Sequence, residues 1–147
     1  MANPFMKSLG EAWRCGNLYR TARFEALGIG SYQDSYILNI CRNPGIAQDA
    51  LTGLIYVHKS NVARQLASLE EKGFITRSPD PKDRRSLLVY PTQKALDAIP
   101  AIREVHRTWN ELVLDGFSEE ERERIAQLAQ RLADNAKRVI ADEHAQE

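Results

Sequence analysis

The sequence predicts a mainly α-helical fold with one small β-hairpin, and three observations support that prediction. Apolar residues recur at steps of three and four through most of the 147-residue chain, which is the period of an amphipathic helix. Two short β-prone runs, 74–77 and 87–90, flank a turn-forming tract, which is the pattern of a hairpin. The element order of short helix, turn, helix and hairpin is typical of a winged helix-turn-helix.

The first two helices are indicated by apolar periodicity and by glycine and proline at their ends. The spacing predicts a first helix over 6–27, which the tract Gly28-Ile29-Gly30 ends. Ser31 is expected to cap a second helix, which ends at Asn43-Pro44-Gly45. The side chains of this second helix that are expected in the core are Tyr36, Ile37, Ile40 and Cys41.

The middle of the chain predicts the helix-turn-helix and its hairpin wing. A short helix over about 48–54 is followed by a helix over about 59–72, with Gly73 in the C-terminal capping position. The apolar stripe of the second of these helices is Val62, Leu66 and Leu69. The tract 78–85 between the two β-prone runs is basic and rich in turn-forming residues, so it is expected to be a charged hairpin tip.

The last third predicts two long helices. The first begins near Thr92, and Pro100 within it is expected to bend or break it. Ser118 and Glu121 form a capping box for the second. That helix carries a narrow, near-heptad apolar stripe made of Ile125, Leu128, Leu132, Ala136 and Val139. So narrow a stripe has too little core of its own and favours pairing with a second copy of the chain.

The chain is therefore expected to be a single domain, 1–147: a mainly α fold with a small β-hairpin wing. A winged helix-turn-helix lobe at about 32–92 would be flanked by N- and C-terminal dimerisation helices at about 6–27 and 93–143. Hydrophobic residues make up 43% and charged residues 27%, as in globular proteins. No segment approaches the roughly 20 apolar residues of a membrane span, and no signal peptide is expected. With only two cysteines, the sequence predicts a cytoplasmic protein without a membrane partner.

The distribution of charge indicates a polyanionic partner. The net charge is zero, but eight basic and four acidic residues give 58–94 a charge of +4. Twelve acidic and seven basic residues give 97–147 a charge of −5. A polyanion would therefore approach the helix-turn-helix and wing.

Several segments together resemble the MarR family of winged helix-turn-helix transcription regulators. They are 27–33, 45–51, 57–66 and 69–75, with a wing at 80–92 that is similar to the family's D-x-R signature at Asp83 and Arg85. The resemblance implies an obligate homodimer that binds a near-palindromic double-stranded DNA operator, acting as a ligand-responsive repressor. The sequence departs from the family at His58, where Asp is usual, and at Pro91, Ala95 and Pro100.

Within this framework the polar residues of the second helix and of the wing are the candidate DNA contacts. Arg64 and Gln65 are expected to contact base edges or phosphate, because Arg reads guanine and amides read adenine. For Asn61, such a contact and a plain solvated helix face are equal alternatives. Lys59 and Ser60 are expected to hold phosphate. Arg85 is the expected wing contact, oriented by a charge-assisted bond from Asp83. Additional phosphate contacts are expected from Lys82 and Arg84.

The resemblance also implies two kinds of signal input. The family commonly binds small aromatic or phenolic effectors, and the candidate lining residues are Trp13, Tyr19, Tyr36 and Trp109. Plain core packing is the alternative for each of them. One branch of the family senses peroxides through a first-helix cysteine, which makes Cys15, with Tyr32 and Tyr36, a candidate redox site. The alternative for Cys15 is a small buried hydrophobe.

Other function classes find little support. The sequence has no Gly-rich phosphate loop, no nucleophile elbow and no H-E-x-x-H motif, so an enzyme is not expected. His58, His106 and His144 lie far apart, so no metal site is expected, and no cofactor is implied. A winged helix kept only for protein interaction remains an alternative, although it would need neither the basic wing tip nor the polar helix face.

Overall fold

The computed structural model describes residues 4–145. Contacts divide it into a first compact unit that ends at Trp109 and a second that begins at Asn110. This division places the first helix with the helix-turn-helix, whereas the sequence grouped it with the C-terminal helices. The elements in chain order are α1 (Phe5–Glu25), α2 (Gln33–Arg42), β1 (Ile46–Ala47), α3 (Ala50–Ile55), α4 (Lys59–Glu71), β2 (Ile75–Pro79), β3 (Leu87–Pro91), α5 (Gln93–Val113) and α6 (Glu119–His144).

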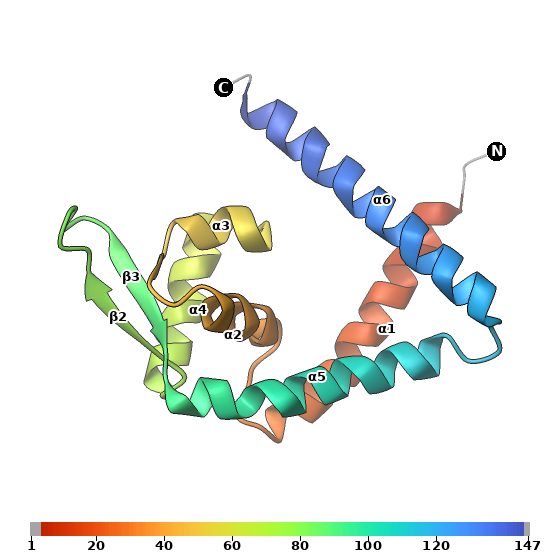
Figure 1. Cartoon of the computed structure of the whole chain (residues 1–147), viewed down its shortest axis with the longest axis horizontal. Helices are drawn as coiled ribbons and strands as arrows, with labels where there is room; N and C mark the ends of the chain where they lie inside the picture. The colour runs from red at the N-terminus through yellow and green to blue at the C-terminus, as the bar shows by residue number, and fades with distance from the viewer. Residues whose placement is uncertain (1–3, 146–147) are drawn as a thin grey trace. The chain divides into compact units, whose positions relative to one another are not determined.

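The first unit contains the predicted hairpin and a short strand that the sequence did not reveal. β2 and β3 pair antiparallel, with Arg77 opposite Val89, and β1 adds to the outer edge of β3. The sheet order is therefore β1-β3-β2, and α2, α3 and α4 pack beside it (Figure 1). β1 has only two residues, too few to show a period of two in the sequence. The mainly helical winged fold is confirmed.

The core of the first unit forms between the sheet and its helices. The predicted stripe of α4 is fully buried, and so are most of the predicted core residues of α2. Phe24 and Ile102 extend this core to α1 and α5. The buried residues of α2 and α4 are Tyr36, Ile37, Ile40, Val62, Leu66 and Leu69, while Cys41 is partly buried against them. Burying a side chain of this size contributes about 1.5–3 kcal/mol, so the core holds α4 rigidly on the sheet.

The helix ends confirm some predictions and correct others. Gly73 follows α4 at φ +80°, a conformation that glycine adopts without strain. The prediction that Ser31 caps α2 is wrong, because Tyr32 occupies that position. The turn is held instead by Gln33, whose side-chain oxygen accepts a hydrogen bond from the backbone N–H of Gly30 at 2.8 Å.

The alternative that Pro100 breaks the long helix is also wrong, while a bend there stays a prediction. α5 runs unbroken from Gln93 to Val113, with Pro100 on its exposed surface. Ala95 and Ile102 on the opposite side are fully buried in the core. Their burial on both sides of the proline stabilises the helix against the loss of one backbone hydrogen bond.

The second unit consists of the end of α5 and the helix α6. The predicted capping box is confirmed: Ser118 Oγ accepts from the Glu121 N–H at 3.2 Å, and Glu121 accepts from the Ser118 N–H at 2.8 Å. No residue of α6 is buried within the single chain. Its apolar stripe is therefore exposed, with Leu128 47% and Val139 55% accessible.

Candidate nucleic-acid interface

The outer face of α4 carries exposed polar side chains near its N-terminus. Ser60 and Arg64 are exposed, and no described residue pairs with the Arg64 guanidinium. Lys59 lies 3.2 Å from Asp49 in an exposed ion pair, whose contribution of about 0–1 kcal/mol leaves the lysine able to exchange its partner. His58 is the N-cap and makes no side-chain capping bond, as its poor capping chemistry predicts.

Two further predicted contact residues of α4 are held by α2. Tyr36 Oη donates a 2.7 Å hydrogen bond to Asn61 Oδ1, and Gln33 Nε2 donates a 3.0 Å hydrogen bond to Gln65 Oε1. Burial raises the pKa of Tyr36, and nearby Arg64 opposes that shift. The phenol is therefore neutral near pH 7 and has a proton to donate. The sequence did not predict this layer behind α4, because residues so far apart along the chain carry no periodic signal.

The wing tip presents unpaired basic side chains on a tightly shaped turn. Asp80 Oδ1 accepts from the Lys82 N–H at 2.9 Å, and Asp83 Oδ1 accepts from the Arg85 N–H at 3.1 Å. The predicted bond between Asp83 and the Arg85 side chain is therefore wrong. A carboxylate two residues before an N–H closes a local turn more readily than it reaches a long side chain. Within residues 4–145, Arg84 and Arg85 have no anionic partner.

A charged cluster joins the wing to α4, the second helix of the helix-turn-helix, which we call the recognition helix. Glu70 of α4 accepts from the Arg77 N–H at 3.0 Å and from Arg77 Nη2 at 2.9 Å. Arg77 Nη1 also donates to Gln48 Oε1 at 3.2 Å. The Arg77 side chain is 19% exposed, so this ion pair is partly shielded from water. It sets the position of β2 against α4, and no local pattern in the sequence marks it.

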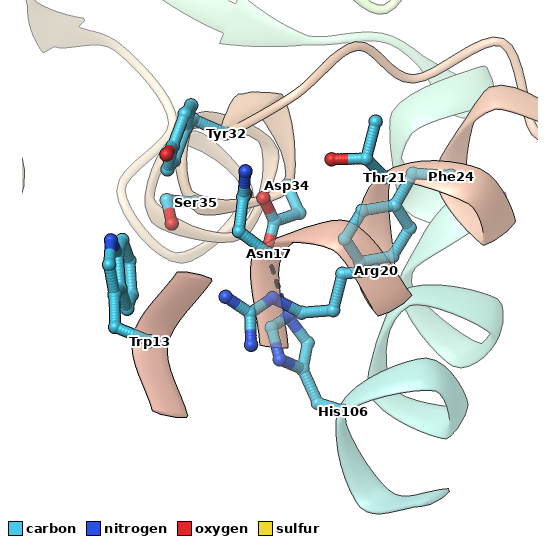
Figure 2. A pocket seen from close by; sticks show the side chains of 9 residues that line it. All are labelled: Trp13, Asn17, Arg20, Thr21, Phe24, Tyr32, Asp34, Ser35 and His106. Carbon is cyan, nitrogen blue, oxygen red and sulfur yellow. Dashed lines mark hydrogen bonds and ion pairs between the residues drawn. The ribbon is translucent and has the colours of Figure 1, made fainter. Parts of the chain in front are cut away.

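A separate pocket of about 240 Å³ lies between α1, α2 and α5 in the first unit. Trp13 and Tyr32 stack at one side with ring centroids 6.0 Å apart, and Arg20 lies over the Trp13 ring. At the other side His106 Nε2 and Asp34 Oδ2 are 2.8 Å apart. The lining residues are Trp13, Asn17, Arg20, Thr21, Phe24, Tyr32, Asp34, Ser35 and His106 (Figure 2).

The four candidate effector residues occupy three different places. Trp13 lines the pocket, whereas Tyr36 is 1% exposed and points to Asn61. Tyr19 and Trp109 pack on each other, with ring centroids 5.2 Å apart, and do not line it. The sequence missed His106 and Asp34, which come together across 72 residues of chain.

The candidate redox residues each have different surroundings. Cys15 is exposed, while Tyr32 contacts Trp13 and Tyr36 contacts Asn61. Among the described residues, no group of three or more His, Cys, Asp or Glu is placed to hold a metal ion. In the same part of the chain, no helix is both long and apolar enough to cross a membrane.

Comparisons with known proteins agree with this geometry. The MarR family model matches residues 33–87, which span α2 to the start of β3. An uncharacterised HTH-type transcriptional regulator of Bacillus subtilis strain 168, YybA, is 31% identical over 136 residues, covering 92% of this chain and 91% of that protein. The chain belongs to the MarR family. It is therefore a transcription regulator and not an enzyme.

Solved MarR structures share its fold over almost the whole length. A crystal structure of MarR is 33% identical, covers 96% of both chains and superposes with a TM-score of 0.88. A MarR family regulator from Listeria monocytogenes, solved with a 26-mer DNA, is 23% identical. The match covers 90% of this chain and 88% of the Listeria chain. Its TM-score of 0.81 shows that the two chains have the same fold.

Proposed function

We propose that this MarR-family regulator is a ligand-responsive repressor that binds a near-palindromic double-stranded DNA operator as a homodimer in the cytoplasm. The observation that supports it best is the set of unpaired guanidinium groups at Arg64, Arg84 and Arg85. They project from a helix and a hairpin tip that the Arg77–Glu70 pair holds in one arrangement. A helix of this kind enters the major groove, and arginine on a wing is attracted to a narrow minor groove.

The proposed mechanism is steric. The dimer occupies an operator and blocks transcription, and an effector releases it by changing the spacing of the two recognition helices. The homodimer is supported by the exposed apolar stripes of the single chain. Leu18 of α1 is 73% exposed and Leu128 of α6 is 47% exposed. Exposed leucines that line one face of a helix mark a surface on which another protein chain can pack.

Specific DNA binding is tested first on the DNA just upstream of the regulator's own gene. Fluorescence anisotropy is expected to show binding about 10³-fold tighter than to unrelated DNA of equal length. The affinity is expected to fall with salt, because each neutralised phosphate adds about −0.9 to the log–log slope. Equal weak binding to both DNAs, together with no enriched fragment in a genome-wide selection, would contradict the proposal.

The pocket between α1, α2 and α5 is the proposed effector site. The Trp13 ring offers a stacking surface, and the Arg20 guanidinium beside it favours an anionic group. A small aromatic carboxylate or phenol fits this chemistry and the volume of about 240 Å³. An effector there would contact α1, α2 and α5 together, and so could bias the position of the recognition helix that α2 supports.

Salicylate serves as a probe of this site in a Trp109→Phe background, where Trp13 is the only remaining tryptophan. Salicylate is expected to quench Trp13 fluorescence and to weaken operator binding. Arg20→Ala should reduce the salicylate affinity by about 10–100-fold, which corresponds to losing a charge-assisted hydrogen bond. Arg23→Ala is the matched control, because Arg23 lies over Tyr19 outside the pocket. Equal salicylate affinities of the two variants would exclude the pocket as the binding site.

A further inference from the structure

The side chain of Gln33 is buried, only 3% exposed, and uses all of its hydrogen-bonding capacity. Its Oε1 accepts from the Gly30 N–H at 2.8 Å and from Lys72 Nζ at 2.9 Å. Its Nε2 donates to Gln65 Oε1 and to Ser68 Oγ, both at 3.0 Å. A backbone N–H and an ammonium can only donate, so the orientation of the Gln33 amide is determined.

The determined orientation of Gln33 also determines that of Gln65. Because Gln33 Nε2 must donate, the atom of Gln65 that faces it must be the acceptor Oε1. Nε2 of Gln65 is then left on the other side of the amide. No described residue accepts from this nitrogen, and no buried side-chain nitrogen lacks a partner within residues 4–145. The Gln65 Nε2 is therefore accessible to solvent.

Asn61 is oriented in the same sense by Tyr36. The neutral Tyr36 hydroxyl is buried, and its proton has no other acceptor among the described residues, so the Asn61 atom that faces it at 2.7 Å is the acceptor Oδ1. Asn61 Nδ2 has no partner among the described residues, so it is solvent-accessible by the same argument. Arg64, one turn along the same face, carries donors only.

We infer that α2 makes Asn61 and Gln65 of α4 present their amide donors to the bases, with Gln33 and Tyr36 as positioning residues that set this base preference. This inference rests on the proposed DNA-binding function and specifies which bases the helix reads. A free Asn or Gln pairs with adenine through one donor and one acceptor, but here each amide oxygen already accepts a hydrogen bond from α2, which directs it toward α2. Guanine, which presents the two acceptors N7 and O6 in the major groove, is the base that donors alone can read.

The test compares the dissociation constants of wild type, Asn61→Ala and Gln65→Ala on operators that carry each of the four base pairs at every half-site position. The positions where an alanine variant loses discrimination are those that the residue reads. At these positions the wild type is expected to prefer guanine over adenine by about tenfold, because the difference of one hydrogen bond recurs in both half-sites of the dimer.

Two substitutions in α2 change how the side-chain amides of Gln65 and Asn61 are oriented. Neither of the substituted residues is expected to contact DNA itself. Gln33→Glu replaces the Nε2 donor with an acceptor, so Gln65 must turn its own Nε2 inward and expose Oε1. The preference at the Gln65 position is expected to change from guanine to adenine or cytosine, whose amino groups donate. Tyr36→Phe frees Asn61 to adopt the bidentate adenine geometry. The affinity for operators with adenine at the Asn61 position is therefore expected to rise. The double variant Gln33→Glu, Gln65→Ala is the control and should show the same base preference as Gln65→Ala alone.

The possible results separate this inference from the proposed function. Specific wild-type binding with adenine or cytosine preferred at the positions that Asn61 and Gln65 read overturns the inference, while the DNA-binding function stands. If Asn61→Ala and Gln65→Ala both keep the wild-type base discrimination, the inference is likewise overturned while the DNA-binding function stands. Absence of any specific binding removes the function and the inference together. If Gln33→Glu does not fold, as thermal unfolding would show, the wild-type base panel and Tyr36→Phe still decide.

Discussion

Arg64→Ala is expected to remove most of the specific operator affinity. A well-placed arginine bond to a base contributes about 1–3 kcal/mol, and a homodimer makes it twice. The expected loss is therefore about 2–6 kcal/mol, or roughly 30-fold and more in the dissociation constant. Arg64 is exposed and makes no hydrogen bond or ion pair with other described residues, so its removal should leave the fold unchanged.

The measurement is fluorescence anisotropy on the operator and on unrelated DNA, repeated across a salt series. Arg85→Ala in the wing should weaken binding to both DNAs and lower the salt slope by about 1 for each phosphate that the wing no longer neutralises. Arg103→Ala is the control, because it removes an equal charge from the exposed surface of α5. Wild-type affinity in both Arg64→Ala and Arg85→Ala would reject the site assignment.

The combined variant Leu128→Glu, Leu132→Glu is expected to dissociate the homodimer. The two leucines are 47% and 36% exposed in the single chain, on a helix without a buried residue. Full burial of a leucine contributes about 1.5–3 kcal/mol, and pairing would bury the exposed fraction of both leucines in both protomers. The loss of about 2–5 kcal/mol is a large part of the roughly 8 kcal/mol that holds a micromolar complex together, and the buried glutamates add a charge penalty.

Sedimentation equilibrium should report the wild type at twice the 16.7 kDa mass of the chain and this variant at or near the single mass. The operator affinity of the double glutamate variant should also fall, because the two half-sites of the operator would no longer be bound together. Gln127→Glu with Gln130→Glu adds the same charge to the opposite face of α6 and should leave the dimer intact. A variant that stays dimeric with glutamates in the stripe would show that α6 is not the interface.

Much of the local structure could be predicted because it depends on neighbours in sequence. The α4 stripe of Val62, Leu66 and Leu69 repeats every three or four residues, so its burial follows from helix geometry. The Ser118 capping box and Gly73 act within one helical turn. The basic wing tip follows from a turn-forming tract between two β-prone runs.

The predictions that failed depend on geometry that no periodic pattern carries. Pro100 is tolerated because α5 packs on the core on both sides of it, and packing outweighs local propensity. Asp83 closes its own turn, so it does not reach the Arg85 side chain. The Asp34–His106 contact and the pocket beside it join α2 to α5, and no local pattern marks such a pairing.

The sequence alone determined the family, the order of the helices and the hairpin, and the residue types on the recognition helix. These properties are carried by periodicity, turn chemistry and motif spacing, which act over a few residues. The tertiary structure decided which atoms those residues present. Gln33 and Tyr36 take the amide oxygens of Gln65 and Asn61, and this depends on α2 and α4 packing side by side. Hydrogen-bond direction is a property of contacting atoms, and only the folded chain brings these atoms together.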